Sequence, residues 1–246
     1  MKPVITAFMR AFRDLGDRRV IAIILLPVLA SLVIWLVIIL WFWQSWVMVL
    51  GDAIGSTQWA RWLRDWGAQW LVNGMGALAL IALMIPALLV TNVVIAEIFA
   101  LPALVKLVSA RDYPMLERRH GGTMVGGTIN ACAGITIFLL VFVLTLPLWL
   151  LGPVGLIAGA LNSAYLAQRL FRYDALSEHA GAGEYDALVK RSRGRLFLLG
   201  LTLSPLNYVP FVNLFVPVLG ALAYTHFCLR ELANLREAEA RGLDAP

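Results

Sequence analysis

Residues 20–43 read VIAIILLPVLASLVIWLVIILWFW, and this stretch decides the class of the fold. It contains no charged residue, and Pro27 near its start is its only proline. A helix needs about 20 apolar residues to cross the hydrocarbon core of a bilayer. Residues 20–43 are therefore predicted to form a transmembrane helix. They are too long for the apolar region of a cleavable signal peptide and lack a clear cleavage site.

The composition of the whole chain agrees with this prediction. Of the 246 residues, 61% are hydrophobic and 14% are charged, whereas a soluble domain carries about 25% charged residues. Because so few charges cannot cover a soluble globule, the sequence predicts an all-α integral membrane protein. Cys132 and Cys228 both fall in apolar stretches without metal-ligand spacing. We expect buried free thiols there rather than a disulfide.

The remaining apolar stretches predict a second long span and two helical hairpins. Residues 129–168 and 196–229 each contain two apolar limbs around a Gly/Pro turn, and some limbs are too short to cross a bilayer. We expect these hairpins to penetrate only part-way, with other subunits or a cavity covering their turns. The shared plan of the hairpins hints at an internal repeat. The predicted single membrane domain, residues 1–246, comprises an amphipathic cytoplasmic helix (1–19), span 1 (20–43), a Trp-rich outside loop (44–70), span 2 (71–96), a cytoplasmic segment (97–128), hairpin 1 (129–168), a cytoplasmic segment (169–195), hairpin 2 (196–229) and a cytoplasmic tail (230–246).

The positions of the basic residues predict the orientation of the chain. Residues 1–19 form an amphipathic, basic segment suited to lying on an anionic membrane face. Of the 20 Lys and Arg residues, only Arg61 and Arg64 fall in the outside loop. Since short loops rich in Lys and Arg stay cytoplasmic, both termini are predicted to be cytoplasmic. The net charge of +5 is thus explained by the bilayer surface, and no nucleic-acid partner is expected.

Tryptophan is concentrated in the outside loop. Trp59, Trp62, Trp66 and Trp70 are three or four residues apart and would share one helical face. An interfacial helix at headgroup depth explains the pattern, because tryptophan favours membrane interfaces. An aromatic cage for a ligand is the alternative.

The residue types that carry enzymatic chemistry form no recognisable arrangement. There is no GxSxG, HExxH or P-loop motif and no Cys/His ligand cluster, so we predict no enzyme, metal or cofactor. No Asp or Glu falls inside an apolar limb, which argues against a proton- or sodium-coupled carrier and a channel with an acidic ring. His226 lies well inside a predicted span, where a hydrogen-bonded packing role is favoured over a ligand or relay role. The sequence remains compatible with passive movement of an anion or a neutral solute, and also with no transport at all.

The start of the first span is a candidate anion site. Gly16 permits a tight turn, the following helix offers free N–H groups, and Arg18 and Arg19 stand beside it. This combination suits a tetrahedral oxyanion. Alternatively, both arginines are ordinary cytoplasmic anchors.

Three asparagines of the hairpins are candidates to line a pathway through the membrane. They are Asn162, Asn207 and Asn213. The last two lie among prolines that interrupt the helix, so capping of the broken backbone is their alternative role.

Three short motifs carry a resemblance to a known family. They are Gly16-Asp17-Arg18-Arg19 with Ile24-Leu25-Leu26-Pro27, then Ala100-Leu101-Pro102, and finally Pro210-Phe211-Val212-Asn213-Leu214-Phe215-Val216-Pro217. Together with the layout of two spans and two hairpins, they resemble the bacterial CysZ-type sulfate permeases. That family shares a domain with the eukaryotic etoposide-induced membrane proteins.

The resemblance implies a passive permease or channel for sulfate or a related oxyanion in the bacterial inner membrane. It places Gly16, Arg18 and Arg19 at the anion site, and it implies a homo-oligomer whose subunits embed the hairpins. Asp17 stands where the family has an aliphatic residue, and its carboxylate would compete with a dianion for the two arginines. The alternative is a non-transporting scaffold or regulatory protein of the same domain family.

Overall fold

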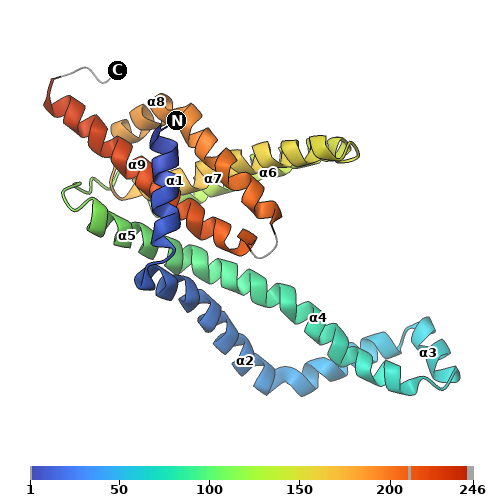
Figure 1. The fold of residues 1–246 in the computed structure, drawn as a ribbon. Coiled ribbons are helices and arrows are strands. Elements are labelled where there is room, and N and C mark those ends of the chain that lie inside the picture. The colour runs from blue at the N-terminus through green and yellow to red at the C-terminus, as the bar shows by residue number, and fades with distance from the viewer. Residues whose placement is uncertain (1, 210–211, 243–246) are drawn as a thin grey trace. The chain divides into compact units, whose positions relative to one another are not determined.

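The structure, a computed structural model, describes residues 2–209 and 212–242, and every regular element among them is helical (Figure 1). The chain divides into two compact units. Unit 1 comprises Met1–Ile21 and Leu101–Pro246, and unit 2 comprises Ala22–Ala100. Three helical stretches among the described residues are long and apolar enough to cross a membrane: Arg18–Gly55, Trp70–Asn92 and Val125–Trp149. The prediction of an all-α membrane protein is confirmed.

Unit 2 contains the two long apolar helices. They are α2 (Arg18–Gly55), whose first turn belongs to unit 1, and α4 (Gln69–Ile95), which continues into the π-helical turn η1 (Ala96–Ala100). The short helix α3 (Gln58–Asp65) joins them. Trp35 Nε1 donates a hydrogen bond of 3.0 Å to Thr91 Oγ1 and so links α2 to α4. Most other apolar side chains of these helices are exposed, as expected of helices that face lipid.

The helix ends in unit 2 differ from those read off the sequence. Helix α2 does not stop at Trp43 but continues to Gly55, so the first part of the predicted loop 44–70 is helical. The prediction that Trp59, Trp62, Trp66 and Trp70 share one helical face is wrong, because α3 ends at Asp65 and Gly67, with a φ of +78°, turns the chain before α4. Trp59 and Trp62 lie on α3, Trp66 is its C-cap, and Trp70 lies on α4. All four are exposed, from 46% for Trp59 to 74% for Trp66. The rings of Trp62 and Trp66 lie 4.9 Å apart between centroids.

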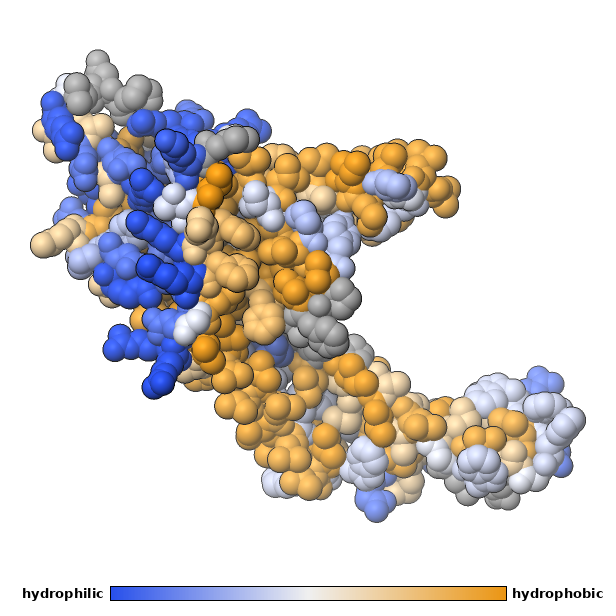
Figure 2. All heavy atoms as spheres, viewed as in Figure 1, coloured by the Kyte–Doolittle hydropathy of each residue, from blue (hydrophilic) through white to orange (hydrophobic). Residues whose placement is uncertain are grey.

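Unit 1 is built around α9 (Val216–Ala240), whose residues from Val218 to Leu229 are all buried. Helices α1 (Lys2–Asp14), α5 (Leu101–Asp112), α7 (Pro153–Ser177) and α8 (Ala182–Leu203) pack against it. Helix α6 (Met124–Trp149) packs along α7. Within this unit, hydrophilic residues gather over the C-terminal half of α9 and the end of α5, whereas hydrophobic residues cover α6 (Figure 2).

Local chemistry explains where the helices of the first hairpin begin and turn. Thr123 caps α6, because its side chain accepts a hydrogen bond from the Gly126 N–H at 2.9 Å. Gly152 has a φ of +59°, which favours glycine, and Pro153 then starts α7 at a position where its missing N–H costs nothing. Helix α7 continues through polar residues to Ser177, beyond the apolar limb that ends at Ala167.

The second hairpin joins α8 to α9 through two short 3₁₀ turns, η2 (Ser204–Tyr208) and η3 (Val212–Phe215). Pro210 and Phe211, which begin the third family motif, lie outside the described residues. Both cysteines are free thiols. Cys228 is buried as predicted, but the prediction is wrong for Cys132, which is exposed on α6 because this helix turns most of its apolar surface outward.

Helix α8 approaches α7 and α9 closely at Gly200. A Cβ atom there would lie 2.6 Å from the Ala164 carbonyl oxygen and 2.8 Å from the Tyr224 hydroxyl, which donates to the Leu196 carbonyl. Gly200→Ala is therefore expected to cost about 1–3 kcal/mol of stability through overpacking. The measurement is the apparent unfolding temperature of the purified protein in detergent. Gly194→Ala on the same helix is the control, since a Cβ there meets nothing within 4 Å; equal losses in both variants would contradict the close packing.

Candidate anion-binding site

A tight turn connects α1 to α2 and places a carboxylate at the N-terminus of α2. The Gly16 N–H donates to the Arg13 carbonyl at 3.1 Å, and the Asp17 N–H donates to the Asp14 carbonyl at 2.9 Å. Asp17 then caps α2, because its Oδ1 accepts a hydrogen bond of 2.9 Å from the Arg19 N–H. The helix N-terminus, which attracts anions, is thus occupied by the chain's own carboxylate.

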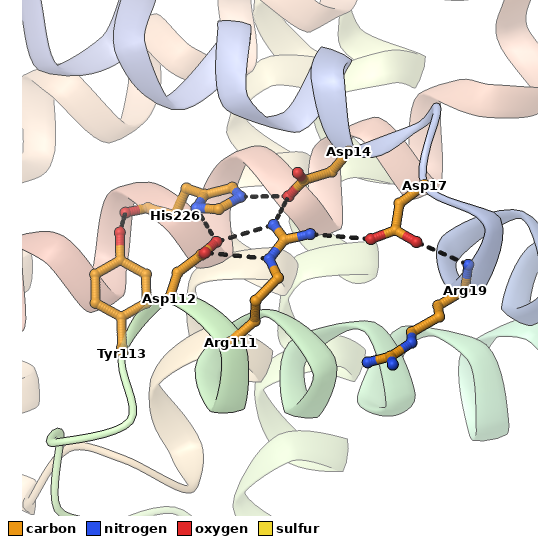
Figure 3. A network of polar contacts seen from close by, with 7 residues as sticks. All are labelled: Asp14, Asp17, Arg19, Arg111, Asp112, Tyr113 and His226. Atoms are coloured by element: carbon orange, nitrogen blue, oxygen red, sulfur yellow. Dashed lines mark hydrogen bonds and ion pairs between the residues drawn. The ribbon is translucent and has the colours of Figure 1, made fainter.

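Arg111, on α5, gathers three carboxylates around one guanidinium group (Figure 3). Its Nη2 lies 2.6 Å from Asp14 Oδ2 and 2.9 Å from Asp112 Oδ2, and its Nη1 lies 3.2 Å from Asp17 Oδ2. The Nε of Arg111 also donates to Asp112 Oδ1 at 3.1 Å. The hydrogen bond from Arg111 holds the pKa of Asp112 below its usual range, so this carboxylate stays ionised.

His226, on α9, extends the network into the core of unit 1. Its Nε2 lies 2.7 Å from Asp14 Oδ2, and both side chains are at most 3% exposed. Its Nδ1 lies 3.8 Å from Asp112 Oδ2. The Tyr113 hydroxyl donates to the His226 carbonyl at 3.0 Å (Figure 3). These contacts join α1, α5 and α9, so the network holds the turn before α2 in place.

Asp14, Asp112 and His226 have the geometry of a possible metal site, since their ligand atoms lie within 4.8 Å of one another. The residues present do not fit a metal, however. Arg111 Nη2 lies within hydrogen-bond distance of both carboxylates and already supplies the positive charge between them. A cation at the same place would meet the guanidinium at close range and be repelled.

The structure keeps the three predicted anion-site residues together at the α1–α2 turn. Gly16, Arg18 and Arg19 are all exposed. Among the described residues, neither Arg18 nor Arg19 forms an ion pair within 4 Å. Both guanidinium groups therefore stay accessible to an anion.

The three candidate pathway residues lie at two places in unit 1. Asn162 is buried on α7, donates to the Phe138 carbonyl of α6 at 3.0 Å, and borders a cavity of about 420 Å³. Asn207 is exposed and donates to the Ser204 carbonyl at 3.3 Å. Asn213 is exposed, and its backbone N–H donates to the Val209 carbonyl at 3.2 Å. Their part in a pathway stays a prediction.

The sequence analysis missed four members of the network, Asp14, Arg111, Asp112 and Tyr113, and of these Asp14 had a signal in its spacing. It lies outside every apolar limb, yet its side chain is 3% exposed. The signal was its spacing: Val4, Ala7, Ala11 and Asp14 recur every three or four residues and form the buried face of α1. A carboxylate on such a face needs a buried partner, and His226 and Arg111 are the partners. The expected hydrogen-bonded role of His226 agrees with this geometry.

The chain matches a known protein family. The family model described as "Sulfate transporter CysZ/Etoposide-induced protein 2.4" matches residues 7–217, which is well over half of the chain. The matched range includes the turn at Gly16, Arg111 with its three carboxylates and most of both hairpins, whereas His226 lies beyond it. Comparisons with curated proteins and with solved structures give no match.

Proposed function

Because this chain belongs to the family of the sulfate transporter CysZ and etoposide-induced protein 2.4, we propose that it is a passive membrane permease or channel for sulfate or a related oxyanion. The proposal includes assembly into homo-oligomers in a bacterial inner membrane, with both termini in the cytoplasm. The asymmetric distribution of Lys and Arg supports that orientation. The widely exposed apolar surface of α6 supports burial against lipid or other subunits.

The observation that carries the proposal is the accessible pair Arg18 and Arg19 at the N-terminus of α2. An oxyanion there would meet two guanidinium groups and the positive end of a helix dipole. It would have to replace the Asp17 carboxylate at the Arg19 N–H. Arg111 offers that carboxylate an alternative partner, since it already binds Asp17 Oδ2. The anion would then move on past Asn162, Asn207 and Asn213.

Uptake of labelled sulfate into proteoliposomes tests the proposal. We expect uptake above empty vesicles, and a loss of at least tenfold in the Arg18→Ala/Arg19→Ala variant, because two charge-assisted contacts of about 1.5–3 kcal/mol each are removed. The matched control is Arg191→Ala/Arg193→Ala, which removes the same charge from two exposed arginines of α8.

Each outcome separates the alternatives. Equal uptake by the wild type and both variants would support transport but contradict anion binding by Arg18 and Arg19, which would then be membrane anchors. No uptake of sulfate, thiosulfate, molybdate or phosphate by the wild type would contradict the permease and favour a non-transporting scaffold.

A further inference from the structure

Helix α1 has an exposed apolar stripe as well as its buried face. Ile5, Met9 and Phe12 are 56%, 67% and 61% exposed, and they lie on the side away from the buried residues Val4 and Ala7. The spacing of four and three residues places the stripe along one line of the helix. A surface helix with such a stripe and basic flanks is typical of segments that lie in the headgroup region of a bilayer.

A polar cavity of about 280 Å³ lies beside this stripe. It is lined by Arg10 and Arg13 of α1 and by Asp112 of α5. Arg13 follows Met9 by one helical turn, so the cavity borders the apolar stripe directly. A cavity volume of about 10–15 Å³ is enough to hold one water molecule. The cavity therefore has room for a hydrated oxyanion.

The lining of the cavity carries a net positive charge. Neither Arg10 nor Arg13 forms an ion pair within 4 Å among the described residues. The one carboxylate in the lining, Asp112, is held by Arg111 through hydrogen bonds of 3.1 and 2.9 Å. Asp14, the carboxylate of α1 itself, is buried against Arg111 and His226. Arg10 also interacts with the Tyr113 side chain and electrostatically with Asp112. The lining nevertheless holds two guanidinium groups against one carboxylate, so the cavity attracts an external anion.

We propose that Arg10 and Arg13 bind the phosphate of an anionic phospholipid, while Ile5, Met9 and Phe12 enter the adjoining acyl-chain boundary. Guanidinium groups bind phosphate through paired hydrogen bonds and are weakly hydrated, which suits them to this role. A free oxyanion would contact only the two arginines and would not cover the apolar side chains of Ile5, Met9 and Phe12. A lipid uses both features of the same helix, and its binding does not depend on whether the protein transports sulfate.

Lipid retention by the full-length protein tests this proposal. The protein is purified in mild detergent, exposed to equimolar phosphatidylglycerol and phosphatidylcholine, and the bound lipids are counted by native mass spectrometry. We expect preferential retention of phosphatidylglycerol by the wild type. The Arg10→Gln/Arg13→Gln variant should lose that preference by on the order of tenfold, since each basic residue contributes to the attraction of anionic lipid. Arg191→Gln/Arg193→Gln on α8 is the charge-matched control and should retain it.

Two further arms make the result decisive. Arg10→Lys/Arg13→Lys keeps the charge but loses the paired geometry, so an intermediate preference is expected, and this variant decides the matter if the glutamine variant does not fold. Inorganic phosphate is titrated separately against wild-type thermal stability. The proposal is overturned if phosphatidylglycerol retention is equal in the wild type and in the variants of Arg10 and Arg13. It is also overturned if inorganic phosphate stabilises the wild type while phosphatidylglycerol is retained no better than phosphatidylcholine, which would assign the cavity to a free oxyanion.

Discussion

Replacing Arg111 with methionine is expected to destabilise unit 1 by about 3 kcal/mol, the low end for a broken buried ion pair, because the Arg111 side chain is itself 33% exposed. The substitution leaves Asp14, at 3% exposure, without its guanidinium partner and leaves Asp17 and Asp112 near it as like charges. For a chain of this length, the apparent unfolding temperature in detergent should fall by about 6–12 °C.

Lys106→Met on the same helix is the control for the Arg111 substitution. Its ion pair with Glu178 is 3.6 Å long and the Lys106 side chain is 57% exposed, so its loss should cost less than about 1 kcal/mol. Adding Asp14→Asn to Arg111→Met should restore part of the stability, because the buried carboxylate that has lost its guanidinium partner is then replaced by a neutral amide. Similar unfolding temperatures for Arg111→Met and Lys106→Met would contradict the network.

Acid should diminish the difference between wild type and Arg111→Met. The pKa of Asp112 is lowered chiefly by its hydrogen bond with Arg111. A lowered folded-state pKa contributes stability that is present above the ordinary value of 3.8 and is lost as the pH falls through the folded-state value. The difference between the two unfolding curves should therefore begin to shrink as the pH falls below 3.8 and continue to shrink with further acidification.

Removing the Asp17 carboxylate is expected to raise sulfate affinity roughly tenfold. A unit negative charge about 5 Å from a dianion opposes binding by about 1.7 kcal/mol even at the dielectric constant of water. Asp17→Leu removes both that charge and the α2 cap, whereas Asp17→Asn removes the charge and keeps a capping side chain. Both variants should bind sulfate more tightly in calorimetry, and Asp17→Leu alone should lose about 1 kcal/mol of stability.

Asp52→Asn provides the matched control for the Asp17 variants, because Asp52 is an exposed carboxylate at the far end of α2. Its affinity for sulfate should equal that of the wild type. If Asp17→Leu and Asp17→Asn both bind sulfate no better than Asp52→Asn, then Asp17 does not compete with the anion for this site.

Hydropathy predicted the helices of this protein better than it predicted their ends. The apolar runs stop at Trp43, Ala167 and Leu229, but α2, α7 and α9 continue to Gly55, Ser177 and Ala240. A backbone hydrogen-bonded helix does not end where the side chains become polar, provided that those side chains find partners. Arg169 on α7 is an example, since its Nε donates to Asn130 Oδ1 at 3.0 Å.

The candidate site was predictable only where it is local in sequence. Gly16, Arg18 and Arg19 are neighbours, and a helix start offers anions N–H groups wherever it occurs. Arg111 lies 94 residues from Asp17, and His226 lies 212 residues from Asp14. A single sequence does not pair such distant residues. The depth of Asp14 could be inferred from its spacing, but its partners could not.

The packing of the first helix against the last has a consequence for how the chain is made. Asp14 and His226 meet only after the ribosome has synthesised nearly all of the protein. During that time the buried face of α1 lacks α9, against which most of it packs, although the apolar residues 20–43 behind it have long been available for insertion. Helix α1 is therefore expected to dock last, as the closing step of unit 1. Nascent chains that stop before Val216 should leave the first helix open to proteolysis, even when the spans are already in the membrane.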